Sequence, residues 1–262
     1  MRYEHAAALA AQGCAFLGAF SSVAADALSG LDVPAFEAFA CYAALGVVYA
    51  PLHWHACAAS GTPLLSAPLA AYLLLACLDV EANYLIVSAF KFTSLTSVTL
   101  LDAAAVPAGL LLSRLLLSAA VTRAHAVAAA VVLLGTGVLV AGDVACGAPA
   151  SSASAGAAPL LGDALTVAAA CLFACSNALQ ERLLVDAPRT EVLALFGLLG
   201  TALSGLTAAV AEAPQLRAVA WDGATLAPLA GFVATVFVSY SIGAFCHLHH
   251  LTASHRRRIS ML

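Results

Sequence analysis

Long apolar runs, separated by short polar or proline- and glycine-containing breaks, make up most of this chain. A helix that crosses the hydrocarbon core of a bilayer needs about 20 mostly apolar residues. The pattern therefore predicts eight membrane-spanning helices. They cover roughly residues 7–28, 34–52, 66–90, 94–117, 124–142, 161–180, 191–211 and 225–247. The first run begins after five residues and lacks a basic leader, so we interpret it as a span and not as a signal peptide.

The composition agrees with lipid as the solvent for these runs. Of the 262 residues, 63% are hydrophobic and 9% are charged, whereas soluble domains contain about 45–50% apolar and about 25% charged residues. A chain of this length has no core large enough to bury so many apolar side chains. The predicted fold class is an all-α, multi-pass membrane helical bundle with the lipid bilayer as a partner. The net charge of −4 gives no reason to expect a nucleic-acid partner.

The basic residues predict which side of the membrane each loop faces. With a cytoplasmic amino terminus, the opposite side holds only Lys91 and Arg217. The cytoplasmic side then holds Arg2, Arg114, Arg123, Arg182, Arg189, Arg256, Arg257 and Arg258. Because positive residues concentrate on the cytoplasmic side, we predict that both termini are cytoplasmic. The organelle (Golgi and other endomembranes, or the plasma membrane) and any homo-oligomer stay open.

A stretch rich in serine, alanine and glycine divides the pattern into two parts. It covers residues 147–159, and its low complexity predicts a flexible joint. The predicted organisation is a first unit at residues 1–146, this joint, and a second unit of three spans at residues 160–247. A basic tail follows at residues 248–262.

Polar side chains inside the third and fourth runs are the main candidates for chemistry. An ionisable group in hydrocarbon costs about 3 kcal/mol, so it normally faces a bundle interior or a watery cavity. Asp79 and Asn83 are four residues apart and share one helix face, whereas Glu81 points about 200° away from Asp79. Asp102 lies in the middle of the fourth run, and Pro107 frees a backbone carbonyl nearby.

Each candidate also has a structural interpretation. The hydroxyls of residues 93–99 are expected to bond to their own backbone or to join helices. For Asp79 and Asp102 we favour a functional role, because a carboxylate inside a span is costly without one. Glu81 stays open between a structural pair and a site, and Asn177 in the sixth run stays open between a cavity residue and a packing residue.

Other polar and small residues have simpler interpretations. Asp163 borders the predicted joint and is expected to be solvated. Small residues in the seventh run predict close helix packing: Gly197, Gly200, Ser204 and Gly205. The histidines near the end lack the carboxylate or cysteine complement of a metal site: His247, His249 and His250. We predict no metal, no cofactor and no enzyme, since no catalytic triad, phosphate loop or HExxH pattern is present.

The string DVEANY at residues 79–84, followed by TSLTSVTLLD at residues 93–102 and a proline five positions later, resembles the signature of solute carrier family 35, F subgroup. This subgroup belongs to the EamA-like drug/metabolite transporter superfamily. Similar strings continue in order along most of residues 10–240. They are AGDV (141–144), GDAL (162–165), SNxxQE (176–181), RTEVLALFGLLG (189–200), SG (204–205) and Trp221–Asp222.

This resemblance implies ten helices built as two inverted five-helix repeats, with a central substrate cavity and alternating access. Relatives carry nucleotide sugars, nucleosides or related metabolites, so the implied partner is a small polar solute. Asp79, Asn83, Asp102 and Asn177 are then the cavity candidates, with Glu81 as a further one. The amides would hydrogen-bond the cargo, and the acids would do the same or carry a coupling proton.

The sequence departs from the family pattern at two places. The family has a lysine at the position of Ser88, whereas the nearby lysine here is Lys91. The family continues after the eighth span with two further helices, whereas this chain ends in HLHHLTASHRRRISML. We expect either a truncated gene model or a short isoform. The alternative function is therefore a truncated, non-transporting membrane protein with a regulatory or partner-binding role.

Overall fold

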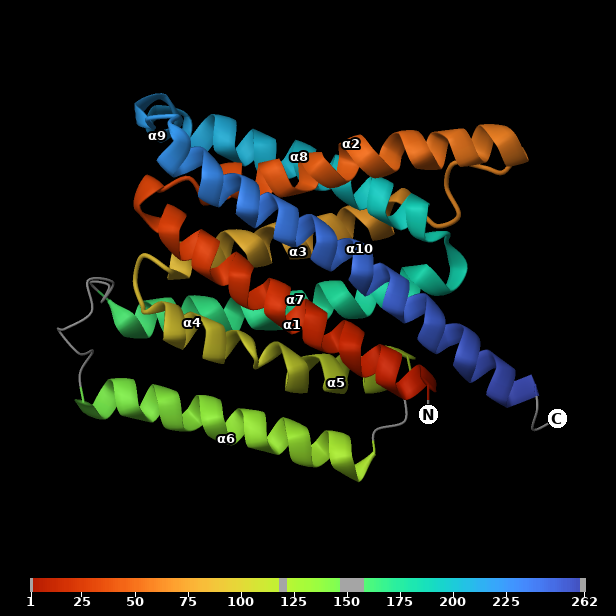
Figure 1. Cartoon of the computed structure of the whole chain (residues 1–262), viewed down its shortest axis with the longest axis horizontal. Coiled ribbons are helices and arrows are strands. Elements are labelled where there is room, and N and C mark those ends of the chain that lie inside the picture. The colour runs from red at the N-terminus through yellow and green to blue at the C-terminus, as the bar shows by residue number, and fades with distance from the viewer. Residues whose placement is uncertain (1, 118–121, 147–157, 260–262) are drawn as a thin grey trace.

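Long helices arranged in a bundle make up the computed structural model of this chain (Figure 1). It describes residues 2–117, 122–146 and 158–259, and within these ranges there is no strand. The helices are α1 (Arg2–Leu28), η1 (Ser29–Leu31), α2 (Pro34–Ser60), α3 (Leu69–Ala89), α4 (Leu95–Asp102), α5 (Ala105–Leu117), α6 (Arg123–Cys146), α7 (Pro159–Asp186), α8 (Arg189–Ala211), α9 (Ala213–Ala218) and α10 (Gly223–Ile259). The predicted joint lies outside the described residues, apart from its last two.

Six segments of the described chain are long and apolar enough to cross a membrane. They are Pro34–Ser60, Leu69–Ala89, Leu95–Leu115, Pro159–Asp186, Arg189–Ala211 and Gly223–Gly243, and each lies on a predicted span. The other two predicted spans correspond to α1 and α6, for which the apolar stretches found among the described residues are Ala15–Leu31 and Arg123–Val138. The predicted multi-pass helical bundle is confirmed. The final helix also continues past the predicted start of the tail, to Ile259.

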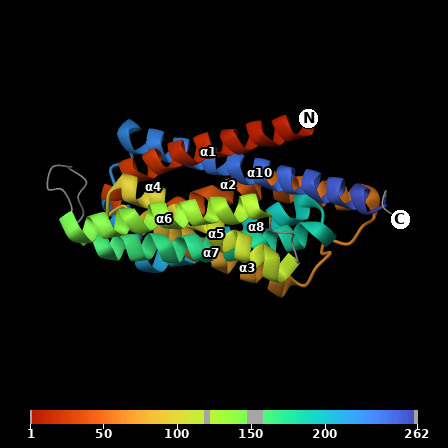
Figure 2. The same cartoon turned by 90° about the horizontal axis from the view of Figure 1, so that it is seen from below.

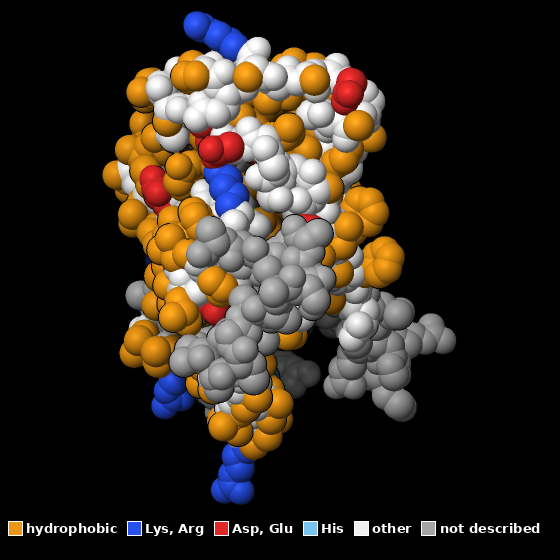
Figure 3. Space-filling model, turned by 90° about the vertical axis from the view of Figure 1, so that its left-hand side faces the viewer, with side chains coloured by type: hydrophobic (Ala, Val, Ile, Leu, Met, Phe, Trp, Pro, Cys, Tyr) orange, Lys and Arg blue, Asp and Glu red, His pale blue; other side chains and the backbone are white. Residues whose placement is uncertain are grey.

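The outer surface of the bundle is apolar. Large hydrophobic side chains such as Val47, Trp54, Leu134, Leu206 and Val210 are more than half exposed. Viewed from the end that carries α9, hydrophobic side chains cover both flanks of the molecule (Figure 3). Soluble monomers rarely expose contiguous apolar surface on this scale. Lipid is therefore the solvent for these flanks.

Three helix pairs build the bundle: α2 packs along α8, α3 along α7, and α1 along α10. A second view shows the helices running roughly along one common axis (Figure 2). At the crossing of α2 and α8, a Cβ on Gly197 would lie 2.4 Å from the backbone nitrogen of Gly46. A Cβ on Gly200 would meet the ring of Tyr42 at 2.6 Å. The predicted role of these glycines in close packing is confirmed.

The fourth predicted span is not one continuous helix. It is divided into α4 and α5 by a turn at residues 103 and 104. Pro107 has no N–H to donate to the carbonyl of Ala103, and its ring clashes with that carbonyl. Asp102 is therefore the last residue of α4, at the break, and the expectation of a mid-helix position is wrong.

Two buried carboxylates hold the two ends of α8 against neighbouring segments. Glu212, just after α8, accepts hydrogen bonds from the backbone N–H groups of Ala35 and Phe36 at 2.8 and 2.9 Å. These groups belong to the first turn of α2, where a helix favours negative charge. Burial raises the pKa of the Glu212 carboxyl, and these two hydrogen bonds oppose that shift. At the other end, Glu191 accepts from Ser66 and from the hydroxyl of Tyr72.

Candidate functional site

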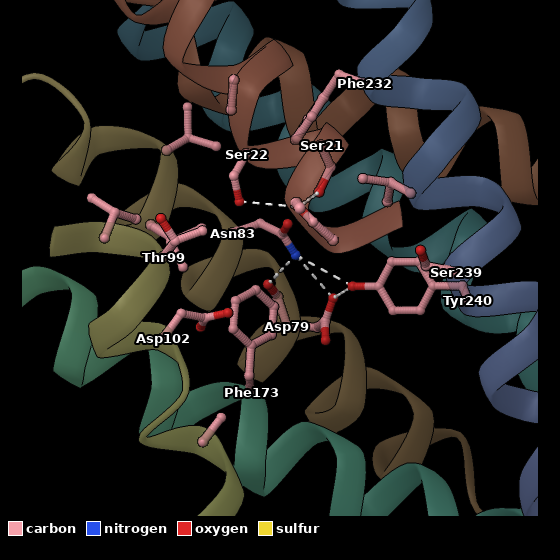
Figure 4. Close-up of a pocket in the computed structure, with 18 of the residues that line it drawn as sticks. Ser21, Ser22, Asp79, Asn83, Thr99, Asp102, Phe173, Phe232, Ser239 and Tyr240 are labelled. Atoms are coloured by element: carbon pink, nitrogen blue, oxygen red, sulfur yellow. Dashed lines mark hydrogen bonds between the residues drawn. The ribbon is translucent and has the colours of Figure 1, made fainter. Parts of the chain in front are cut away.

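A cavity of about 660 Å³ lies between helices from both parts of the chain (Figure 4). Its wall comes from α1, α3, α4 and α5 of the first predicted unit and from α7 and α10 of the second. The polar lining residues are Ser21, Ser22, Asp79, Asn83, Thr99, Asp102, Asn177, Gln180, Ser239 and Tyr240. The aromatic ones besides Tyr240 are Phe90, Phe173 and Phe232. A small number of polar groups in an otherwise apolar enclosure is typical of a site for a small molecule.

Asp79 is the centre of a hydrogen-bond network within this wall. Its side chain is 1% exposed. One carboxylate oxygen accepts from Ser176 at 2.6 Å. The other accepts from Tyr42 at 2.7 Å, from Asn83 at 3.0 Å and from the hydroxyl of Tyr240. We call Asp79, Tyr42, Asn83, Ser176 and Tyr240 the Asp79 hub.

The hub joins four helices at one point. Tyr42 comes from α2, Ser176 from α7 and Tyr240 from α10, while Asp79 and Asn83 lie one turn apart on α3. A buried carboxylate is tolerated when hydrogen-bond donors satisfy its lone pairs. The four donors meet that requirement and fix the helices relative to one another.

Three hub residues were not among the sequence candidates: Tyr42, Ser176 and Tyr240. A signal for the tyrosines was present, because a tyrosine inside an apolar run usually has a partner for its hydroxyl. Sequence alone could not assign that partner, since Tyr240 and Asp79 are 161 positions apart. Ser176 directly precedes Asn177, which had been singled out, but the two side chains differ in burial. Ser176 is fully buried, whereas Asn177 is exposed to the cavity it lines.

Asp102 has different surroundings from Asp79. Its side chain comes from the end of α4 and lines the cavity together with Thr99 (Figure 4). Its Oδ1 is buried, and among the described residues it has no hydrogen-bond partner. A buried acceptor without a donor costs about 1–3 kcal/mol. Asp102 thus lines the cavity and has one buried carboxylate oxygen without a donor among the described residues.

Glu81 lies away from the cavity. Its side chain is exposed on the outer side of α3, two positions from Asp79, and it is absent from the lining residues. This direction follows from helix geometry, which turns residues two apart to opposite faces. The structure therefore brings together Asp79, Asn83, Asp102 and Asn177 and leaves Glu81 outside the group.

Two charged residues at the end of the bundle that carries α9, Asp163 and Lys91, interact with other side chains. Asp163 is 3% exposed and accepts a hydrogen bond from Thr93 at 2.9 Å, so the expectation that it is solvated is wrong. Burial follows because α7 starts against the loop between α3 and α4, where Thr93 lies. Lys91 forms an ion pair with Asp32, and it does not line the cavity.

The described part of the chain is thus a multi-pass helical bundle with a cavity lined by residues from both predicted units. The family described as solute carrier family 35 matches residues 10–262 of this chain. The chain belongs to this family, in its F subgroup. The predicted resemblance is confirmed, and this is a family of solute transporters.

Curated relatives carry the same family name. Solute carrier family 35 member F2 of Mus musculus is 34% identical over 175 residues, which are 67% of this chain and 44% of the relative. The protein of the same name from Xenopus tropicalis is 31% identical over 171 residues, 65% of this chain and 44% of the relative. An "uncharacterized solute carrier family 35 member" of Schizosaccharomyces pombe is 27% identical over 225 residues, which are 82% of this chain and 42% of the relative. The chain thus matches less than half the length of these relatives.

Proposed function

We propose that this chain carries a small polar solute across a membrane through the cavity of about 660 Å³, by alternating access. The observation that carries the proposal is the position of Asp102. Asp102 lines a cavity formed by both parts of the chain, and its buried Oδ1 has no hydrogen-bond partner among the described residues. Such a group gains a partner when a solute or a proton arrives, and it loses that partner when either leaves.

The broken span supports this assignment. Transporters bind solutes near the middle of the membrane at discontinuous helices, where backbone groups and polar side chains are freed from regular helix bonding. The turn between α4 and α5 is a break of this kind, and Asp102 and Ala103 beside it line the cavity.

The helix pairs also support the predicted inverted repeats. In two such repeats, α1 would correspond to α7, α2 to α8 and α3 to α10. Exchanging each helix for its counterpart turns the α1–α10 pair into the α7–α3 pair. The same exchange returns the α2–α8 pair to itself, with Gly46 and Gly197 at its crossing. Two repeats related by a two-fold axis in the membrane plane would pack in this way. Alternating access would then move one repeat against the other around the cavity.

The contacts at the end that carries α9 suit a gate. Lys91 and Asp32 join the loops that follow α3 and α1, and Thr93 and Asp163 join the α3–α4 loop to the start of α7. A partly exposed ion pair is worth about 0–1 kcal/mol. Opening this end would therefore cost little at the Lys91–Asp32 pair, as a reversible gate requires.

Uptake into proteoliposomes tests the proposal. Vesicles with the full chain are incubated with a mixture of polar metabolites, and their contents are identified by mass spectrometry. We expect at least one solute to accumulate with the wild-type chain and with the Glu81→Gln variant. Asp102→Asn should lower that accumulation by about tenfold or more, because it removes the free carboxylate, while the amount of inserted protein stays the same.

Identical profiles for empty vesicles and for vesicles with the wild-type chain would contradict the proposal. That result would favour the alternative, a non-transporting membrane protein that binds partners. Normal uptake by Asp102→Asn would leave the carrier function and contradict the role of this residue. The cytoplasmic position of both termini stays a prediction.

A further inference from the structure

Three hydroxyls on the cavity wall, those of Ser21, Ser22 and Thr99, present acceptors and not donors. Ser21 and Ser22 donate to the carbonyl of Gly18 at 2.8 and 3.1 Å (Figure 4). Thr99 donates to the carbonyl of Leu95. A hydroxyl has one hydrogen and two lone pairs. Because each hydrogen is engaged within its own helix, each group offers its oxygen lone pairs to whatever enters the cavity.

The Asp79 hub engages further donors of the same wall. The amide nitrogen of Asn83 donates to the hydroxyl of Tyr42 at 2.8 Å and to the Asp79 carbonyl at 2.9 Å. Tyr240 donates its hydrogen to the Asp79 carboxylate. Because the amide nitrogen of Asn83 is engaged in these bonds, its amide oxygen is the polar group that remains for a ligand in the cavity. This oxygen adds one more acceptor.

Asp102 completes this pattern. An ionised carboxylate only accepts hydrogen bonds, and its buried Oδ1 has no donor among the residues that the structure describes. Four aromatic rings line the same cavity, those of Phe90, Phe173, Phe232 and Tyr240. The face of an aromatic ring attracts cations through its quadrupole. Acceptors, a free carboxylate and aromatic rings together suit a positively charged ligand that brings N–H donors.

We propose that the cavity takes a small organic cation with N–H groups, of the amidinium or protonated-amine class, and that Asp102 is its counter-ion. This inference rests on the proposed function, because it assumes that the cavity is the cargo site. It narrows the cargo class, since the diphosphate of a nucleotide sugar would bring acceptors and negative charge to a wall that already supplies both. The amides of Asn177 and Gln180 on α7 can donate and accept, and they suit polar substituents elsewhere on the solute.

A charge series built on one ring tests this inference without any transport. Benzamidinium, benzamide and benzoate have nearly the same shape and carry charges of about +1, 0 and −1 at neutral pH. Their dissociation constants are measured by calorimetry on the full chain in detergent micelles. We expect benzamidinium to bind about tenfold or more tightly than the other two, through charge-assisted N–H bonds to Asp102.

Three variants identify the group responsible. Asp102→Asn should reduce the preference for benzamidinium to about threefold or less, and Asp102→Glu should restore part of it, because the negative charge returns. Glu81→Gln removes a carboxylate from the outer side of α3 and should keep the full preference. Phenyltrimethylammonium, a cation without N–H groups, should bind more weakly than benzamidinium. Equal binding by these two cations would overturn the donor requirement.

Other outcomes overturn the inference as a whole. These are tighter or equal binding of benzamide or benzoate, no detectable binding of benzamidinium, or an unchanged preference in Asp102→Asn. Failure of this inference can be distinguished from failure of the proposed transport function. Cation binding without uptake of any solute would contradict the carrier function alone. Uptake of an anionic solute without cation binding would contradict the cation site alone.

Discussion

Asp79 and Asp102 are two carboxylates in the wall of one cavity, and they differ in their hydrogen-bond partners. Both oxygens of Asp79 accept hydrogen bonds, from donors on four helices. Asp102 has a buried oxygen that receives none within the described chain. A satisfied carboxylate holds its donors in place, whereas an unsatisfied one gains most from a ligand. The comparison distinguishes a residue whose carboxylate is fully hydrogen-bonded from a residue that we propose binds the solute.

The largest effect on stability is expected from Asp79→Asn. The new NH₂ group would face hydroxyl and amide donors, so the hub would lose acceptors and gain a donor. We expect a loss of about 3 kcal/mol or more in the free energy of unfolding. The apparent melting temperature in detergent, followed by tryptophan fluorescence, measures it. An unchanged melting temperature would show that the hub does not organise the bundle.

A smaller loss is expected from Tyr240→Phe. This change removes one of the four donors and keeps the ring, whose centroid lies 5.2 Å from that of Phe196. Hydrogen bonds to charged groups contribute about 1.5–3 kcal/mol, so a loss of about 2 kcal/mol is expected. The melting temperature measures this loss as well. A loss of stability as large as that of Asp79→Asn would mean that the Tyr240 hydrogen bond accounts for the whole effect of the hub.

Asp102→Asn should change stability by about 1 kcal/mol or less, because no donor in the described part of the chain loses its partner at the buried oxygen. The same variant should lose uptake. Loss of uptake with little loss of stability would distinguish Asp102 most clearly from Asp79, since Asp79→Asn should lower both uptake and stability. A strong fall in melting temperature for Asp102→Asn would place Asp102 with Asp79 as a structural residue.

The smallest effect is expected from Glu81→Gln. Its side chain is exposed on the outer side of α3, and surface substitutions usually change the free energy of unfolding by about 0.5 kcal/mol or less. Melting temperature and uptake should both match the wild-type chain. A loss of uptake would give Glu81 a role that its position outside the cavity does not suggest.

Sequence reasoning predicted the positions of the spans because lipid imposes a length and a polarity on each of them. It also identified four residues that line the cavity, because polar groups are rare in such helices and each one is informative. It failed at Asp163, whose burial depends on contact with Thr93, 70 positions away. It also missed the break after Asp102, although Pro107 carried the signal, because a proline in a membrane helix can produce either a kink or a full break.

The chain by itself determined that it is a membrane bundle and which few polar residues enter it. Hydrophobicity, helix period and family strings are local properties, because each depends on residues that are close together in the sequence. The tertiary structure alone decided that both oxygens of Asp79 accept hydrogen bonds, whereas Oδ1 of Asp102 receives none from the described residues. That difference depends on hydroxyls delivered by α2, α7 and α10, and only helix packing brings them to α3.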